Sequence, residues 1–314
     1  MCLLCFPFFT PYSLHPPPPP SFHLTRTSEQ QNYNFSEQIS AIEARRKTIP
    51  GAPEWYFMYP TNSGPSASQM DAIVNSGVSG SRVMADCHVG YTGGLQCAEE
   101  SLVWQQYNGS GINCETNAVT SHLQRGVQEA ADLMEWFNAP ANVSSRLRAR
   151  TASFCIQRSG QMRDEWDQGL SFFLPNMTWL QPPGVVHQMI SSLWLPNALA
   201  VNNSAGGDPF KGPSAAAQVS DDGKTLNVLL ANNDWGGAPA NVTLVLNGFT
   251  PNSNFDWWIM AEPGTGPANR TTGNTPANPD YIKSDKRSGT WPSSGSLQLA
   301  LPPLSFSILV LKSA

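Results

Sequence analysis

The sequence contains little charge. Asp, Glu, Lys and Arg together make up 13% of the 314 residues, and the formal net charge is −5 with an isoelectric point of about 5.5. A protein that binds a phosphate backbone needs a concentrated positive field. The composition therefore argues against a nucleic acid as a partner.

Long apolar runs and clusters of metal ligands are also lacking. No stretch of eighteen or more apolar residues occurs, whereas a membrane-spanning helix needs about 20, so we expect no membrane span. Cys2 and Cys5 lie in a segment that we expect not to fold, and no His/Cys cluster has the spacing of a zinc site. We therefore expect no metal. Cys87 and Cys97 either form a disulfide in an oxidising compartment or remain two thiols.

The start of the chain lacks a clear signal peptide. No basic segment precedes the apolar stretch from Cys2 to Phe9, and five prolines, at 16–20, follow it. We expect residues 1–45 to form a disordered leader. Ten tryptophans and seven N-x-S/T sequons nevertheless favour an extracellular or cell-wall glycoprotein. The sequons are at Asn34, Asn108, Asn142, Asn176, Asn202, Asn241 and Asn269.

The remaining chain divides into two regions with different sequence patterns. Residues 46–204 alternate short strand patterns with helical ones, which is typical of an α/β architecture. The clearest helix is predicted from Val119 to Phe137, and a second from Val185 to Leu193. Residues 205–314 begin with a Gly/Pro linker and continue as short alternating runs between turn residues, which predicts an antiparallel β-sandwich.

The most informative motif is Cys114-Glu115-Thr116. It follows an interval rich in Gly, Ser and Asn and directly precedes the amphipathic run of the first predicted helix. With the helix that follows, it looks like the nucleophile segment of a retaining glycosidase, which needs two carboxyl groups about 5–5.5 Å apart. The structural alternative is a solvated loop carboxylate.

Several later segments resemble glycoside hydrolase family 51, the α-L-arabinofuranosidases. The stretches Gln181–Ile190 and Trp194–Leu199 look like the end of the catalytic barrel. Three further stretches look like strands of the C-terminal sandwich: Val219–Leu226, Leu229–Asn233 and Leu301–Leu311. The resemblance runs from roughly residue 110 to 314. It implies the fold class: α/β followed by all-β, in which the last strands and helices of a (β/α)8 barrel precede a jelly-roll-like antiparallel sandwich.

By this resemblance Glu115 is the catalytic nucleophile. Thr116 stands where the family has Tyr or Trp, and no asparagine in the chain is followed by the glutamate that serves as the family's acid/base. The family's N-terminal β-domain and about six of its barrel strands have no visible counterpart. The chain therefore looks like a C-terminal portion that lacks the general acid/base, and two barrel strands alone cannot assemble an active site.

Other candidates have weaker support. Glu54, beside Trp55, is a fallback acid, because a carboxyl group against an indole can have a raised pKa. His187 lies in an apolar helical pattern, where a satisfied core histidine is commoner than a catalytic one. Some of the tryptophans are candidate sugar platforms: Trp55, Trp136, Trp166, Trp179, Trp257 and Trp258. Trp257 and Trp258 are adjacent in a predicted strand, so they face opposite sides.

The resemblance implies a retaining hydrolase that needs no cofactor and releases terminal arabinofuranosyl groups from arabinan or arabinoxylan. An arabinose-containing polysaccharide or oligosaccharide is then the partner. Two alternatives stay open: a non-catalytic carbohydrate-binding sandwich module, and an incomplete gene product.

Overall fold

The structure is a computed structural model that describes residues 35–55, 57–61, 82–89, 111–116, 122–139, 147–152, 154–158, 169–204, 212–234 and 236–314. For strands β1 to β5 the structure describes the backbone only, except that the side chain of Ile156 is described and is exposed. The elements before the sandwich are α1 (Phe35–Lys47), β1 (Phe57–Thr61), β2 (Val83–Val89), β3 (Gly111–Thr116), α4 (Leu123–Asn138), β4 (Leu147–Ala152), β5 (Phe154–Arg158), β6 (Gly169–Leu174), β7 (Met177–Leu180) and α6 (Pro182–Ser192).

Four strands form a parallel sheet in the order β1-β2-β3-β4. Thr61 of β1 pairs with Cys87 of β2, which pairs with Cys114 of β3. Parallel neighbours require crossover connections, so this sheet confirms the predicted α/β class for the first half. Strands β5 and β6 add a second parallel pair, and β7 returns antiparallel to β6. More of a barrel is therefore present than the two strands expected from the sequence.

Helix α1 is tied to the parallel sheet by an ion-pair cluster. The Glu43 carboxylate accepts hydrogen bonds from Arg46 at 2.7 and 2.9 Å and from Arg82 at 2.9 and 3.1 Å. Arg82 directly precedes β2 and also donates to the carbonyl of Trp55. The hydrogen bonds from Arg46 and Arg82 hold the pKa of Glu43 well below its usual range. Residues 35–45, which the sequence assigns to a disordered leader, therefore form most of α1 instead. Residues 1–34 of that leader lie outside the described ranges.

The predicted helix after Glu115 is confirmed as α4, which begins at Leu123 rather than at Val119. Its apolar side chains recur at helical spacing and are fully buried on one face, as an amphipathic helix requires. These residues are Leu123, Val127, Ala130, Ala131 and Met134. Gly126 brings α4 against the start of α6, because a methyl group there would lie 2.8 Å from the Pro182 carbonyl carbon.

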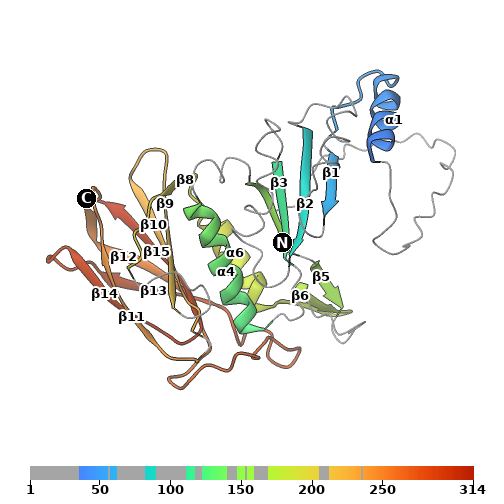
Figure 1. Cartoon of the computed structure of the whole chain (residues 1–314). Coiled ribbons are helices and arrows are strands. Elements are labelled where there is room, and N and C mark those ends of the chain that lie inside the picture. Colours follow the sequence, from blue (N-terminus) through green and yellow to red (C-terminus); the bar gives the residue numbers. More distant parts are fainter. Residues whose placement is uncertain are drawn as a thin grey trace.

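The second predicted helix is confirmed as α6. Two prolines open it, where the missing N–H groups cost no intrahelical hydrogen bond. Gly184 lets the helix lie on β6, since a methyl group at this position would approach the Leu170 oxygen to 2.1 Å. Figure 1 shows α4 and α6 side by side, between the parallel strands and the strands of the C-terminal half.

The C-terminal half is a sandwich of two antiparallel sheets, as the sequence predicts. Its strands are β8 (Asn197–Leu199), β9 (Pro213–Val219), β10 (Thr225–Asn232), β11 (Ala240–Val245), β12 (Pro251–Met260), β13 (Ser284–Thr290), β14 (Ser296–Leu301) and β15 (Ser305–Ser313). Six of them form one sheet in the order β13-β12-β15-β10-β9-β8, and β11 pairs with β14. Strand β8 precedes residue 205, so the larger sheet starts before the predicted boundary.

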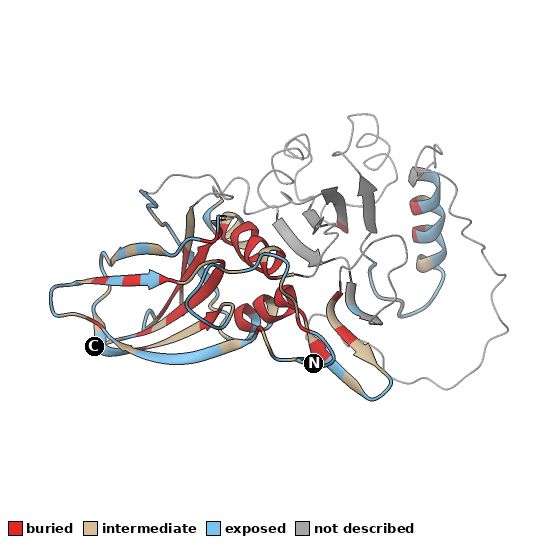
Figure 2. Cartoon of the chain, turned by 90° about the horizontal axis from the view of Figure 1, so that it is seen from below, coloured by how far each residue is buried: buried red, intermediate tan, exposed pale blue. Residues whose placement is uncertain are grey.

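The six-stranded sheet is covered on both faces. One face packs against α4 and α6 through Leu229, Met260, Phe306 and Ile308. The other face packs against β11 and β14 through a second core that includes Leu230. A strand covered on both sides should be almost continuously apolar, and seven of the eight residues of β10 are buried. Figure 2 shows the buried residues gathered on the two helices and the strands beside them.

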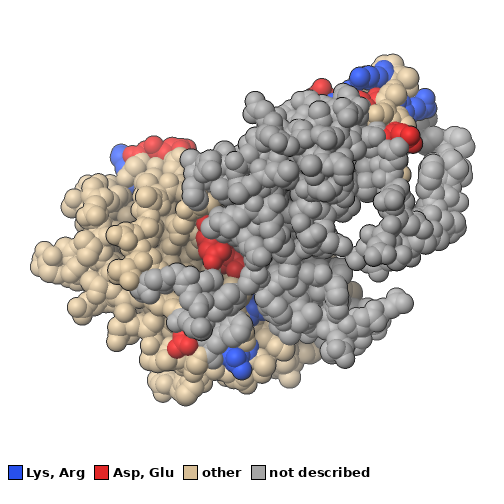
Figure 3. All heavy atoms as spheres, in the orientation of Figure 1, with Lys and Arg blue, Asp and Glu red and all other residues tan. Residues whose placement is uncertain are grey.

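The described surface carries few charges. On the face drawn in Figure 3, most described atoms belong to uncharged residues, and acidic and basic groups are scattered. Among the described residues, no helix is long and apolar enough to cross a membrane.

Candidate functional site

Glu115 is the penultimate residue of β3, at the carboxyl end of a strand inside the parallel sheet. Active sites of parallel α/β folds lie at this edge, because all strands end there and the loops that follow converge. The structure describes the backbone of Glu115 and not its side chain. Its role as nucleophile therefore remains a prediction.

Two polar residues occupy the register positions beside Glu115. His88 of β2 pairs with it on one side and Thr151 of β4 on the other. Neither is visible as a candidate in the sequence, because the pairing of parallel strands separated by long connections leaves no local pattern. The strand register is the signal that finds them, and it places an ionisable histidine next to the predicted nucleophile.

The prediction of Glu54 as a partner acid is wrong on topological grounds. Glu54 is exposed and lies three residues before β1, whose first residue, Phe57, pairs with Val83 at the start of β2. It thus lies at the amino edge of the parallel sheet, whereas Glu115 lies at the carboxyl edge. Retaining glycosidases hold their two carboxyl groups about 5–5.5 Å apart, which these positions do not allow.

The helix that follows Glu115 is capped by the sandwich. The first backbone N–H groups of a helix have no intrahelical acceptor, and no side chain caps α4. Instead Leu123 N donates to Thr272 O at 2.7 Å and Gln124 N donates to Arg270 O at 3.1 Å. Both acceptors lie in the loop 261–283 between β12 and β13. The carboxylate of Glu262 fixes this loop by accepting from the Thr272 hydroxyl at 2.9 Å.

Asn274 anchors the same loop to the start of α6. Its amide group donates to the carbonyls of Leu180 and Ile282 and accepts from Ile282 N, each at 2.7 Å. Its backbone exchanges hydrogen bonds with the Gln181 side chain at 2.8 and 3.0 Å, and Trp179 Nε1 donates to its carbonyl. Asn274 is 5% exposed, so these bonds satisfy groups that water does not reach.

A buried polar network runs along α4. Arg125 Nη2 donates to Glu129 Oε2 at 2.7 Å, and Arg125 Nη1 lies 3.9 Å from Asp132 Oδ2, with all three side chains 2% exposed. Gln128 joins this network to the sandwich: it donates to Asp132 and accepts from Asn233, which follows β10. Buried charges need such partners. The network therefore links α4 to the sandwich at Asn233.

His187 belongs to this network. Its Nε2 lies 3.3 Å from Glu129 Oε1, and its side chain is 23% exposed. A half-buried histidine with a carboxylate partner on a neighbouring helix fits the structural interpretation of this residue, namely a satisfied core histidine. Within the described ranges, no group of three or more His, Cys, Asp or Glu side chains is arranged to hold a metal ion.

The candidate platform tryptophans are mostly covered. Trp257 packs on the core between the two sheets and Trp258 on the core beneath the helices, which confirms that they face opposite sides. Arg287 lies over the Trp257 ring and Lys286 over the Trp258 ring, each at 5.6 Å. Trp179 is buried, Trp136 is half-buried, Trp55 is 41% exposed and Trp166 lies outside the described residues.

Comparisons with known proteins show which solved structures have a similar fold. No protein-family model and no curated protein matches the chain. Among solved structures, an arabinose-bound GH51 α-L-arabinofuranosidase matches 89% of this chain with a TM-score of 0.64 at 15% identity. The α-L-arabinofuranosidase of Thermotoga maritima, in an arabinose complex, matches 88% with a TM-score of 0.61 at 13% identity. The GH51 enzyme of Thermotoga petrophila RKU-1 matches 88% with a TM-score of 0.62 at 14% identity.

The chain has the fold of the C-terminal portion of a family-51 α-L-arabinofuranosidase. It covers 42% of the first of these chains and 62% of the other two. The sequence predicts a family-51 resemblance from about residue 110 onward, but the structural match spans 88–89% of the chain. The additional part contains β1 and β2, which pair in parallel with each other and with β3.

Proposed function

We propose that this chain is an α-L-arabinofuranosidase-like glycoside hydrolase, in which Glu115 attacks the anomeric carbon of a terminal arabinofuranosyl group of an arabinan or arabinoxylan. The observation that carries the proposal is the place of Glu115, at the carboxyl end of a parallel strand in a family-51 fold. The similarity to those solved structures covers 88–89% of the chain, which includes both the parallel strands and the sandwich.

The first step requires a carboxylate nucleophile. The Glu115 carboxylate forms an ester bond to the anomeric carbon as the bond from that carbon to the leaving oxygen breaks, and the electron pair goes to the leaving group. An alkoxide leaving group needs a proton from an acid, a contribution of typically about 10²–10⁴-fold. The family's Asn-Glu acid/base is absent from this sequence. A nitrophenolate needs no proton to depart.

The second step returns the carboxylate. Water attacks the anomeric carbon, the ester bond breaks and Glu115 is released as its anion. Without a general base this step is the slower one for a nitrophenyl substrate, so the arabinosyl ester accumulates. His88 is the ionisable neighbour of Glu115 by register and is a candidate to assist the water.

The test is trapping of the ester. After rapid mixing of the full chain with p-nitrophenyl α-L-arabinofuranoside, we expect a burst of nitrophenol of about one equivalent, followed by slow turnover that added azide accelerates. Peptide mapping by mass spectrometry should find one pentosyl group on the peptide that contains Glu115.

Two variants make the result specific. Glu115→Gln should abolish the burst and the labelled peptide, whereas Glu54→Gln, at the opposite edge of the sheet, should leave both unchanged. A parent chain with no burst and no labelled peptide contradicts the proposal. Binding of arabinan without either would favour the sandwich module instead.

We also propose an extracellular or cell-wall location. All four sequon asparagines within the described residues are exposed, namely Asn176, Asn202, Asn241 and Asn269. Asn176 lies in the turn between β6 and β7, where a bulky glycan has room. This supports glycosylation, because an acceptor must reach the surface.

A further inference from the structure

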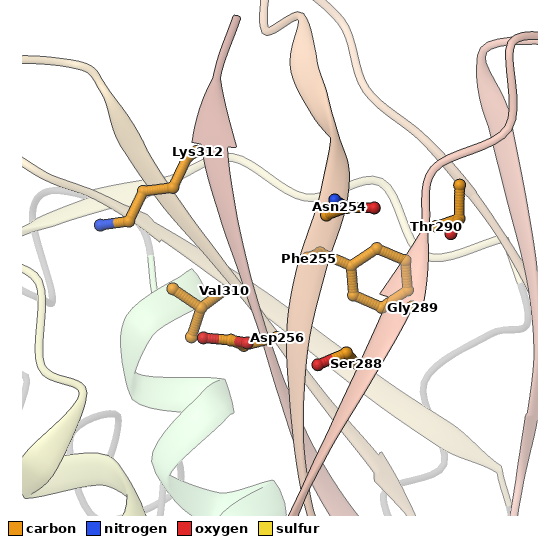
Figure 4. A pocket seen from close by; sticks show the side chains of 8 residues that line it. All are labelled: Asn254, Phe255, Asp256, Ser288, Gly289, Thr290, Val310 and Lys312. Atoms are coloured by element: carbon orange, nitrogen blue, oxygen red, sulfur yellow. The ribbon is translucent and has the colours of Figure 1, made fainter.

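The sandwich carries a polar depression far from Glu115 in sequence. It has a volume of about 420 Å³ and is lined by Asn254, Phe255, Asp256, Ser288, Gly289, Thr290, Val310 and Lys312. These residues come from three neighbouring strands, β12, β13 and β15, of the six-stranded sheet (Figure 4). Sites that bind small molecules are typically about 300–1,000 Å³.

The depression continues the face of the sheet that the helices cover. Side chains two residues apart in a strand share a face. Met260 of β12 lies under the helices, Asp256 is half-buried and Asn254 is exposed. In β15, Ile308 lies under the helices and Lys312 is exposed. Along β12 and β15, the helix-side face of the sheet is therefore apolar under the helices and polar beyond them. The depression lies in the polar part.

Several lining side chains have hydrogen-bond donors or acceptors that no other residue uses. Within the described part of the chain, Asn254, Ser288 and Thr290 make no side-chain hydrogen bond to another residue. Lys312 Nζ donates one of its three hydrogens to Thr225 Oγ1 at 2.9 Å. Asp256 Oδ2 lies 2.9 Å from Lys286 Nζ, which leaves further lone pairs on the carboxylate. The depression therefore offers amide, hydroxyl, ammonium and carboxylate groups together.

Phe255 lies on the opposite face of the sheet from the polar lining side chains, because it alternates with Asn254 and Asp256 along β12 and packs in the core between the two sheets. Gly289 of β13 pairs with it. A methyl group at this position would lie 2.2 Å from the Phe255 ring, so the ring occupies the space that any other residue would fill. Figure 4 shows the Phe255 ring over Gly289 and the Asp256 and Val310 side chains next to each other. On the face of the depression, the apolar side chain among the polar ones is Val310, and three strands whose register is fixed carry the lining.

We propose that this depression binds a neutral saccharide unit of a polysaccharide. Lys286 pairs with the Asp256 carboxylate and Lys312 adds a single ammonium, so the lining carries no concentrated charge that would select a strongly anionic or cationic ligand. Sugar hydroxyls both donate and accept, as the lining groups require, and the C–H face of a sugar fits the Val310 side chain. The site is a binding subsite on the sandwich, and it does not depend on whether Glu115 is catalytic.

Affinity electrophoresis of the full chain in gels that contain soluble arabinan or arabinoxylan tests the site, with saturation-transfer NMR on arabino-oligosaccharides as a second readout. We expect millimolar binding, since the site is open. Asn254→Ala combined with Ser288→Ala and Thr290→Ala should weaken it at least about tenfold. Lys312→Met, which keeps most of the side-chain stem, should weaken it several-fold and checks the result if the triple variant does not fold.

Two control variants separate this site from others. Asn241→Ala combined with Thr243→Ala alters exposed polar residues of β11 in the other sheet and should leave binding unchanged. Glu115→Gln should also retain binding at the depression, so a failure of the proposed catalysis is distinguishable from a failure of this site. Absence of saccharide binding by the parent chain overturns the proposal, and so does unchanged binding by the folded triple variant and by Lys312→Met.

Discussion

The parallel sheet and the sandwich are held to their helices in different ways. In the part of the chain that the structure describes, helix α1 is joined to the parallel sheet by charged contacts around Glu43, and it also buries Ile39. Helices α4 and α6 are joined to the sandwich by a continuous apolar core and by hydrogen bonds of buried groups. Helix α4, which follows the strand that carries Glu115, is therefore held firmly in place. It follows a strand of the parallel sheet in the chain but packs on the sandwich.

The largest effect should follow from removing the charge at the centre of the α4 network. Arg125→Met leaves Glu129 and Asp132, both 2% exposed, without the guanidinium that faces them. Breaking a buried ion pair in this way costs about 3–5 kcal/mol. Urea unfolding of the full chain, followed by circular dichroism, should show this loss of stability.

Arg270→Met serves as the control, because Arg270 is exposed in the loop that caps α4. Its effect should stay within about 0.5 kcal/mol. Equal effects of the two substitutions would mean that the charges on α4 contribute no more than surface charges, and the contrast between the two regions would disappear.

A smaller loss is expected from Asn274→Ala. The substitution leaves the buried Leu180 carbonyl and both backbone groups of Ile282 without the amide partner. An unsatisfied buried group costs about 1–3 kcal/mol, and we expect a total of about 2–4 kcal/mol. Hydrogen exchange should show faster opening at the first turn of α4, because the loop supplies its acceptors.

Asn278→Ala lies in the same loop at an exposed position and should change neither stability nor exchange. If Asn274→Ala destabilises the chain without affecting exchange at Leu123 and Gln124, the loop does not control the start of α4.

The smallest effect concerns pH and should be confined to α1. The pKa of Glu43 is lowered in the folded chain, so its contribution is present above its unfolded value of about 4.3 and is lost as the pH falls below that value. Amide exchange in α1, corrected for intrinsic rates, should accelerate at pH 3 relative to pH 7. Exchange in β10 and β15 should keep its protection over the same range.

Glu43→Gln should reproduce the fast α1 exchange at pH 7 and remove its pH dependence. Acceleration of β10 together with α1 in the parent chain would show that the two regions open as one unit.

The parts predicted from sequence are those with a local pattern. Leu297, Leu299 and Leu301 alternate with exposed residues, so β14 is readable, and the spacing of Val127, Ala130 and Met134 marks α4. Strand β4 alternates apolar and polar residues only over its first four positions, Leu147 to Arg150, which is too short a pattern to identify it. Its place beside β3 depends on long-range pairing, which local sequence does not encode.

The candidate site was predictable to a similar extent. Glu115 follows from its context and the family resemblance, whereas His88 emerges only from the strand register. The depression was not predictable either, because its lining comes from three strands that lie far apart along the chain. Isolated polar residues such as Asn254 and Thr290 look like ordinary surface residues in the sequence.

The capping of α4 by carbonyls of Arg270 and Thr272 limits how this protein can be divided or recombined. A shortened chain that stops before the sandwich would expose the first turn of the helix immediately downstream of Glu115, and a grafted sandwich from another source would have to present acceptors at the same two positions. In a fusion that joins one half of this chain to another protein, the first turn of α4 should therefore be the first part to unfold.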